Sequence, residues 1–117
     1  MAKIFIIDDC TLITKLYSDY LVAHGHEVQC FNSPFGVTVQ MKKETPDLIL
    51  IDYSMPALNG SELLKLMRKN GTFRAILISG SNREEIAALK TEGVCDDFFV
   101  KGEELGLLLE KVNRLAG

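Results

Sequence analysis

The sequence has little of what marks several large classes of protein. It contains only three cysteines among 117 residues, Cys10, Cys30 and Cys95, which lie far apart and lack C-x-x-C spacing. This favours reduced thiols in a cytosolic protein over a disulfide framework or a zinc site. No apolar run approaches the roughly 20 residues that span a bilayer, so we expect no membrane helix. The net charge of −3 argues against broad electrostatic binding to nucleic acid or to an anionic membrane.

Signs of export or of several domains are also missing. The first residues, MAKIFIIDD, hold one lysine followed by acids and no small-residue cleavage site, which argues against a signal peptide. No linker, repeat or low-complexity tract interrupts the chain, whose length fits a single domain over residues 1–117. We expect it in the cytoplasm. Nothing resembling an output domain follows the last predicted helix, and a stand-alone protein and a fragment of a longer one both stay open.

Short apolar runs alternate with stretches in which apolar residues recur at helical spacing. The runs predict strands at 3–8, 26–31, 47–52, 75–79 and 97–101. The periodic stretches predict helices at 11–24, 60–70, 81–93 and 103–116. Gly25 and Gly93 stand where two of these helices end, and Ser81 with Glu84 forms a capping box at the start of one.

The stretch between the second and third strands is ambiguous. Every second residue from Phe35 to Met41 is apolar, as in a strand. Ser33 followed by Pro34, however, is a helix start signal, with serine as the N-cap and proline at the first helical position. Because the stretch also lies between two predicted strands, we expect a short helix here.

Several predicted strands are nearly continuous apolar runs, such as Leu48–Ile51, rather than alternating ones. This is typical of a parallel sheet that helices cover on both faces. The sequence therefore predicts an α/β fold: a flavodoxin-like, doubly wound, five-stranded parallel sheet of order 2-1-3-4-5 with five helices. In such a sheet the functional site lies beyond the carboxyl ends of the strands, near the switch point between strands 1 and 3.

Polar residues follow four of the five strands. Asp8 and Asp9 end the first, Asp52 the third, Ser79 the fourth and Lys101 the fifth, whereas the second ends without a polar group of this kind. Each residue has an ordinary reading, as a helix cap, a turn residue or a solvated strand end. Together they predict one cluster at one edge of the sheet.

Three carboxylates in one place repel one another unless a cation, a lysine or protonation offsets their charge. Mg²⁺ suits a site made only of oxygen ligands, including carboxylates and phosphate. A lysine and a hydroxyl group can in addition hold a phosphoryl group. The cluster therefore has the parts of a phosphoryl-transfer site.

The full set of residues resembles the receiver domain of two-component response regulators, over the whole chain. It comprises Asp8-Asp9, Asp52, Met55-Pro56, Gly60, Ser79-Gly80, Asp97 and Lys101. The resemblance implies that Asp52 accepts a phosphoryl group from a phosphohistidine of a sensor histidine kinase or phosphotransfer protein. It also implies that Asp9, Asp52 and the carbonyl group of Ser54 bind Mg²⁺, with Asp8 contributing through a bound water molecule.

The resemblance further implies that Lys101 pairs with a phosphoryl oxygen and that the Ser79 hydroxyl group hydrogen-bonds the phosphoryl group. Phe98 matches the aromatic switch position and would move inward with Ser79. The face made by helix 4, strand 5 and helix 5 would then change its contacts with a downstream effector or output domain. Such a domain catalyses only its own phosphorylation and dephosphorylation and is not a turnover enzyme.

Two departures from the family pattern stand out. Gly102 follows Lys101 where the family usually has proline, and we expect a trans peptide bond there. Phe98 replaces the common tyrosine and lacks its hydroxyl group. The resemblance implies that Ser54 and Ser81 flank the path of the attacking water, and neither is an acid or an amide. We therefore expect slow to intermediate self-dephosphorylation.

Other readings stay open. Gly102 favours a degenerate receiver that acts as a phosphorylation-independent binding module. A haloacid-dehalogenase-type phosphohydrolase fits less well, since its nucleophile ends strand 1 and a second aspartate follows two residues later. A flavodoxin fits poorly, because Asp8 and Asp9 would repel the flavin phosphate. The leucine-rich last helix is core packing or, alternatively, the face of a homodimer.

Overall fold

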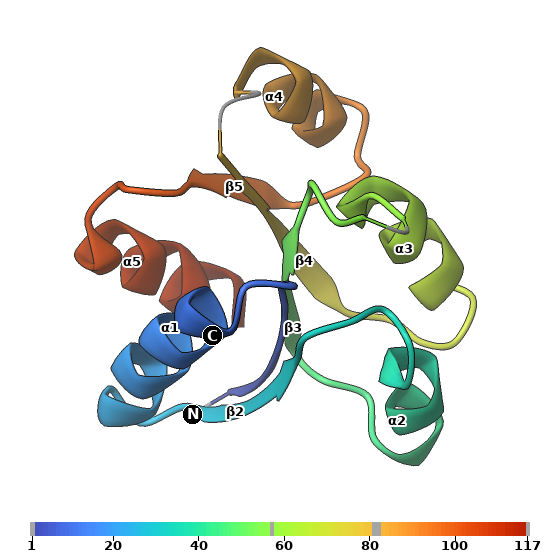
Figure 1. Cartoon of the computed structure of the whole chain (residues 1–117), viewed down its shortest axis with the longest axis horizontal. Helices are drawn as coiled ribbons and strands as arrows, with labels where there is room; N and C mark the ends of the chain where they lie inside the picture. The colour runs from blue at the N-terminus through green and yellow to red at the C-terminus, as the bar shows by residue number, and fades with distance from the viewer. Residues whose placement is uncertain (1, 57, 81–82, 117) are drawn as a thin grey trace.

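The computed structural model describes residues 2–56, 58–80 and 83–116, in which strands and helices alternate (Figure 1). The strands are β1 (Lys3–Ile7), β2 (Glu27–Phe31), β3 (Leu48–Asp52), β4 (Arg74–Ser79) and β5 (Asp97–Val100). The helices are α1 (Thr11–Ala23), α2 (Val37–Lys43), α3 (Gly60–Met67), α4 (Arg83–Thr91) and α5 (Leu105–Ala116). None of the described helices combines the length and the apolar character needed to cross a bilayer.

The strands form one parallel sheet of order β2-β1-β3-β4-β5, which confirms the predicted fold class. In this register Ile7 at the end of β1 lies beside Phe31 of β2 on one side and Ile51 of β3 on the other. The loops that leave β1 and β3 lead to helices on opposite faces of the sheet (Figure 1). Asp8, directly after β1, and Asp52, the last residue of β3, are therefore neighbours at the switch point.

Helices cover both faces of the sheet, as the continuous apolar runs predict. Met41 of α2, Leu64 of α3 and Ile86 of α4 belong to the core on one face. Leu21 of α1 and Val112 of α5 belong to the core on the other. Figure 1 shows these two groups of helices on opposite sides of the strands. All of β3 is buried, including Asp52 at its carboxyl end.

The short helix between β2 and β3 exists, but it begins at Val37 and not at Pro34, and its N-cap is Gly36 and not Ser33. Ser33 Oγ accepts a hydrogen bond of 3.1 Å from the Phe35 N–H, and Gly36 then adopts a left-handed φ of +88°. Ser33 thus closes a turn that the left-handed glycine separates from the helix, which is why the predicted start was wrong.

The other helix ends lie close to the predicted ones. Gly25 and Gly93 have φ values of +91° and +82°, as expected of glycines that end helices. Helix α3 ends at Met67, earlier than the predicted residue 70. The capping box of Ser81 and Glu84 includes a residue outside the described part of the chain and stays a prediction.

Candidate functional site

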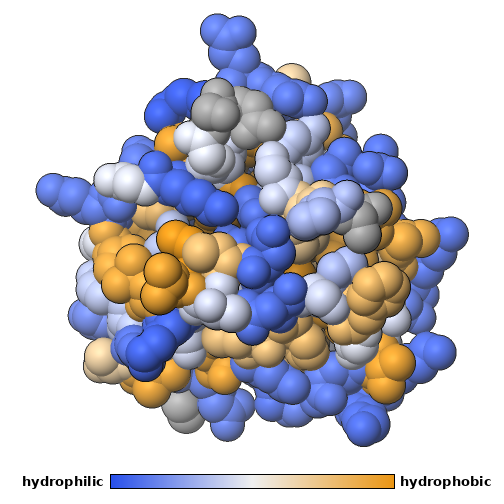
Figure 2. All heavy atoms as spheres, in the orientation of Figure 1, coloured by the Kyte–Doolittle hydropathy of each residue, from blue (hydrophilic) through white to orange (hydrophobic). Residues whose placement is uncertain are grey.

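Three aspartates meet where β1 and β3 end. Asp8, Asp9 and Asp52 each offer a carboxylate oxygen, and these oxygens lie within 4.8 Å of one another. Asp8 and Asp52 are only 2% exposed, whereas Asp9 is exposed. In Figure 2 hydrophilic residues occupy the middle of the view, where β1 in Figure 1 runs into its connection to α1. The sequence predicted this cluster correctly, because neighbouring parallel strands bring their carboxyl ends together.

Lys101 supplies the positive charge of the cluster. Its Nζ lies 3.4 Å from Asp8 Oδ2 and 3.4 Å from Asp52 Oδ1. The Lys101 N–H donates a hydrogen bond of 2.7 Å to the carbonyl group of Ser79, which ties the loop after β5 to the end of β4. Ser79 is buried. Asp8, Asp52, Ser79 and Lys101 therefore lie at one edge of the sheet, as predicted.

The start of α3 packs directly on the end of β3. A Cβ atom added to Gly60 would lie 2.5 Å from the Asp52 carbonyl oxygen, so only glycine fits this contact. The Gly60 N–H donates to the carbonyl group of Tyr53 at 2.8 Å, and Asn59 caps the helix by accepting from the Glu62 N–H at 2.9 Å. This close approach holds the backbone of Asp52 in place.

Hydrogen bonds to the backbone fix the Asp8 side chain. Asp8 Oδ1 accepts from the Cys10 N–H at 2.9 Å, and the Asp8 N–H donates to the carbonyl group of Phe31 at 3.1 Å. Asp8 Oδ2 is buried and accepts no hydrogen bond from the described residues, although Lys101 lies beside it. A buried carboxylate oxygen without a donor is a position at which a cation would be stabilised.

One supporting residue was missed by the sequence analysis. The expectation that β2 ends without a relevant polar group is wrong, since Asn32 follows this strand. Its side-chain amide donates to the Asp8 carbonyl oxygen at 3.0 Å and to Thr14 Oγ1 at 3.1 Å. The available signal was an asparagine directly after a strand that pairs with β1.

The crowding of acids shifts their pKa values. Burial, followed by the charge of Asp8, raises the pKa of Asp52 to about 6 against the opposing effects of Lys101 and the Ser54 N–H. Burial likewise raises the pKa of Asp8. For Lys101 burial lowers the pKa, but the charges of Asp8 and Asp52 outweigh it and the net pKa is raised. The site thus holds more negative charge than one lysine neutralises.

The oxygen ligands at this edge can hold a divalent cation. Three carboxylates face one lysine, and the metal-ligand atoms that these three aspartates offer are all oxygens. Oxygen ligands are typical of a Mg²⁺ site, whereas zinc sites mostly use nitrogen and sulfur. The exposure of Asp9 leaves the cluster open to solvent on one side. A cation can therefore reach the Asp9 carboxylate from solvent.

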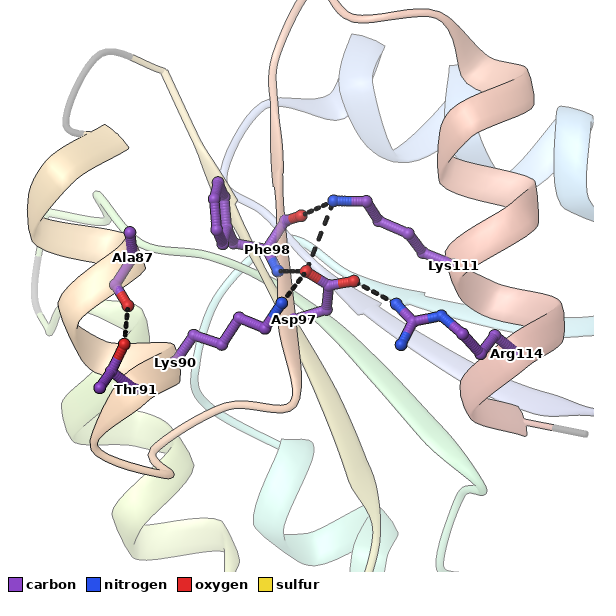
Figure 3. Close-up of polar contacts among 7 residues, drawn as sticks. All are labelled: Ala87, Lys90, Thr91, Asp97, Phe98, Lys111 and Arg114. Atoms are coloured by element: carbon purple, nitrogen blue, oxygen red, sulfur yellow. Dashed lines mark hydrogen bonds and ion pairs between the residues drawn. The ribbon is translucent and has the colours of Figure 1, made fainter.

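Three other residues named from the sequence lie at the edge of this cluster or beyond it. Ser54 is exposed, and its N–H contacts Asp52 Oδ1 at 3.3 Å. Phe98 is half-buried, with Arg83 Cζ 5.7 Å and Lys111 Nζ 5.1 Å from its ring centroid. Asp97 begins β5 and therefore lies away from the carboxyl edge, where Lys90, Lys111 and Arg114 surround it (Figure 3).

The loop after Lys101 differs from the family pattern in the predicted way. No peptide bond in the described part of the chain is cis, and Gly102 has a left-handed φ of +95°. This φ value favours glycine and is closed to proline, whose ring fixes φ near −65°. Lys101 nevertheless reaches both buried aspartates.

Comparison with known proteins identifies the family. The family model for the response regulator receiver domain matches residues 4–113. The chain is a response regulator receiver domain. Its fold is therefore that of the receiver domains of two-component and chemotaxis response regulators, and its acidic edge is consistent with this assignment.

Individual relatives support this assignment. The receiver domain is 28% identical to the chemotaxis protein CheY of Bacillus subtilis over 96% of this chain and 95% of that one. It is 30% identical to protein PilH of Pseudomonas aeruginosa over the full length of both chains. A CheY-like receiver domain from Methanospirillum hungatei superposes with a TM-score of 0.89 at 25% identity, over 99% and 94% of the two chains. The chain spans about half of the Escherichia coli transcriptional regulatory protein TorR, to which it is 29% identical.

Proposed function

We propose that this receiver domain, over residues 1–117, is a phosphoacceptor that takes a phosphoryl group onto Asp52. The donor would be the phosphohistidine of a sensor histidine kinase or phosphotransfer protein. The observation that carries the proposal is the position of Asp52, buried at the end of β3, with Lys101 Nζ 3.4 Å from its carboxylate and two more aspartates beside it. A buried aspartate whose pKa is raised by burial and by a like charge, at the switch point of the sheet, is a candidate functional residue.

Mg²⁺ is the cation that we propose for this site. Asp9, Asp52 and the Ser54 carbonyl group would hold it, with Asp8 in the outer shell, where Oδ2 lies 3.4 Å from Lys101 Nζ and accepts no hydrogen bond from the described residues. When bound, Mg²⁺ would neutralise charge on the carboxylates and on the phosphoryl oxygens. A bound cation would also lower the raised pKa of Asp52, because a nearby positive charge favours the ionised form of a carboxyl group. The ionised carboxylate is the form that must act as nucleophile.

In the proposed transfer a carboxylate oxygen of Asp52 attacks phosphorus and forms a new P–O bond. The P–N bond of the phosphohistidine breaks, and its electron pair stays on the imidazole nitrogen of the donor. Lys101 stabilises charge on the phosphoryl oxygens from its position between Asp8 and Asp52. Ser79, on the neighbouring strand β4, would donate a hydrogen bond from its hydroxyl group to a phosphoryl oxygen.

Phosphorylation would be read at the α4–β5–α5 face. Ser79 and Phe98 would move together and change how this face contacts a downstream effector or output domain. The domain would then act as a cytoplasmic switch and not as a turnover enzyme. A homodimer through α5 would be another form of the same output, since several leucines of α5 are only partly buried.

A second candidate is a degenerate receiver that binds its partner without phosphorylation. The observation that favours it is Gly102, whose left-handed backbone replaces the usual proline beside Lys101. This alternative keeps the fold and the binding face but removes the transfer step.

Intact-mass spectrometry after incubation with acetyl phosphate tests the choice. We expect a gain of one phosphoryl group that requires Mg²⁺ and is absent from Asp52→Asn. Asp97→Asn is the matched control, because Asp97 is an equally buried aspartate outside the cluster and should leave the gain intact. After removal of the donor, the phosphorylated form should decay over longer than seconds. No gain in a folded protein, from acetyl phosphate or from a cognate kinase, would favour the degenerate module.

A further inference from the structure

Asn32 lies one residue beyond β2 and contacts the segment that carries the acidic cluster. Its amide group donates two hydrogen bonds, one to the Asp8 carbonyl oxygen at 3.0 Å and one to Thr14 Oγ1 at 3.1 Å. These partners lie 24 and 18 positions earlier in the chain. The two N–H groups of this amide therefore bind the residue that follows β1 and the first turn of α1, and not the turn that contains Asn32.

The first of these bonds acts on the peptide unit that joins Asp8 to Asp9. The orientation of this unit sets the direction of both side chains, because one lies on each side of it. The Asp8 N–H is already fixed by the Phe31 carbonyl group at 3.1 Å. With Asn32 on the carbonyl oxygen, the backbone of Asp8 is held on both its donor and its acceptor side.

The second bond extends this hold into α1. Thr14 is buried, and its Oγ1 also donates to the Thr11 carbonyl oxygen at 3.0 Å. Asn32 thereby links β1 to the first turn of α1, the helix whose N-cap is Cys10. The Cys10 N–H is the group that orients Asp8 Oδ1, at 2.9 Å. Asn32 thus binds the Asp8 carbonyl oxygen directly and is linked to the Cys10 N–H through the first turn of α1.

From these contacts we propose that Asn32 is a positioning residue that aims Asp8 and Asp9 toward the cation of the acidic cluster. The inference rests on the proposed function, because the cation is part of it. Asn32 does not touch the cation itself. It acts as the outer partner of a metal ligand does, by restricting the orientation of the group that binds.

The test is Mg²⁺ affinity measured by isothermal titration calorimetry on wild type and Asn32→Ala. We expect the dissociation constant to rise about 10-fold or more, the loss typical of removing an outer partner of a metal ligand. Ser33→Ala is the matched control. It also removes one hydrogen bond, to the Phe35 N–H, but one that lies inside the β2–α2 turn, and it should leave the affinity within about twofold.

Hydrogen exchange of the Cys10 amide, measured without Mg²⁺, gives a second readout. Its bond to Asp8 Oδ1 should open more often in Asn32→Ala and leave exchange unchanged in Ser33→Ala. Thr14→Val, which removes the acceptor of the second Asn32 bond, should give a smaller loss of affinity, and Thr14→Ser should restore it. This pair keeps the test decisive if Asn32→Ala fails to fold.

Wild-type Mg²⁺ affinity in folded Asn32→Ala would overturn the inference while leaving the proposed function intact. A wild type that binds no Mg²⁺ would overturn the metal-dependent function, and with it the role of Asn32 toward a cation. In that case unchanged Cys10 exchange in Asn32→Ala would also exclude a hold on Asp8, whereas faster exchange would show that the hold exists without the metal.

Discussion

Asp52 and Asp97 are both aspartates and are buried to nearly the same degree, 2% and 3% exposed, but they lie at opposite strand ends of the sheet. Asp52 lies at the carboxyl end of β3, beside two carboxylates and one lysine. Asp97 lies at the start of β5, beside Lys90, Lys111 and Arg114 (Figure 3). Burial raises the pKa of Asp52 to about 6. Burial also acts on Asp97, but the Phe98 N–H and the neighbouring cations outweigh it and lower its pKa.

The difference shows that burial alone does not decide what an aspartate does. Asp97 has more cationic partners than it needs, so its ionised form is stable and it clamps α4 and α5 to β5 (Figure 3). Asp52 has too few, so the fold holds negative charge that a bound cation can offset. The negative charge of Asp97 is balanced by its cations, whereas the cluster around Asp52 keeps negative charge that Lys101 alone does not balance.

The largest effect that separates the two residues should be a pH dependence of stability. A carboxyl group whose pKa is raised by folding binds more protons in the native state, so the free energy of unfolding falls as pH rises. For Asp52, with an ordinary value of 3.8 and a folded value of about 6, this fall covers about pH 4 to 6. Asp52→Asn should remove this fall, so that its free energy of unfolding exceeds that of the wild type by about 2–3 kcal/mol at pH 7.

Urea denaturation from pH 3 to 7 without divalent cations measures this difference. Asp19→Asn is the control for the loss of one aspartate charge, because Asp19 is exposed on α1 and pairs only with Lys15 among the described residues. For Asp97 the sign is opposite: its lowered pKa gives stability that is lost as pH falls below about 4. A constant difference between Asp52→Asn and wild type across pH 4 to 6 would contradict the crowding of charge at the site.

A direct comparison at neutral pH should give opposite signs for the two aspartates. Asp97→Asn removes the charge that holds three cations and should lower the free energy of unfolding by about 1–2 kcal/mol. The loss stays in this range because Lys90 and Arg114 are about half exposed and regain water. Asp52→Asn is its matched partner and should raise the same quantity. If both variants lost the same free energy of unfolding, the surroundings of Asp97 and Asp52 would not differ in their balance of charge.

Much of this comparison could be predicted from the sequence. Strand ends are readable because an apolar run that stops at Asp8, Asp52 or Lys101 places its last polar residue at a known edge of a parallel sheet. The fold class followed from the same runs and from the helical spacing between them. The sequence also predicted the trans peptide bond at Gly102.

The rest depends on contacts that no local pattern encodes. Asp97 follows Asp96 in the sequence, and only the packing of α4 and α5 shows that three cations converge on it. Asn32 resembles an ordinary turn residue until β2 is paired with β1. The need for glycine at position 60 appears only when α3 is placed against the carbonyl group of Asp52.

The smallest expected effect concerns which structural elements position the cationic side chains beside each aspartate. The three cations around Asp97 come from helices, whereas Lys101 is placed by a loop that turns at Gly102 with φ of +95°. Gly102→Ala should lower the free energy of unfolding by about 1 kcal/mol, because a side chain disfavours this conformation, although no described atom lies within 4 Å of the added carbon. Thermal or urea denaturation measures the loss, and the rate of phosphorylation by acetyl phosphate measures the aim of Lys101.

Gly106→Ala separates the effect of backbone conformation from that of the added methyl group. Gly106 lies in α5 without a left-handed φ, and a Cβ atom added there would meet no described atom within 4 Å, so alanine should raise stability by about 0.5 kcal/mol. Asp97, whose cations do not depend on the loop, should keep its lowered pKa in both variants. If Gly102→Ala slows phosphorylation while Gly106→Ala does not, the turn at Gly102 sets the position of Lys101. If neither does, the turn at Gly102 does not set the position of Lys101, and the surroundings of Asp52 and Asp97 differ in the number of their charges and not in how the cations are supported.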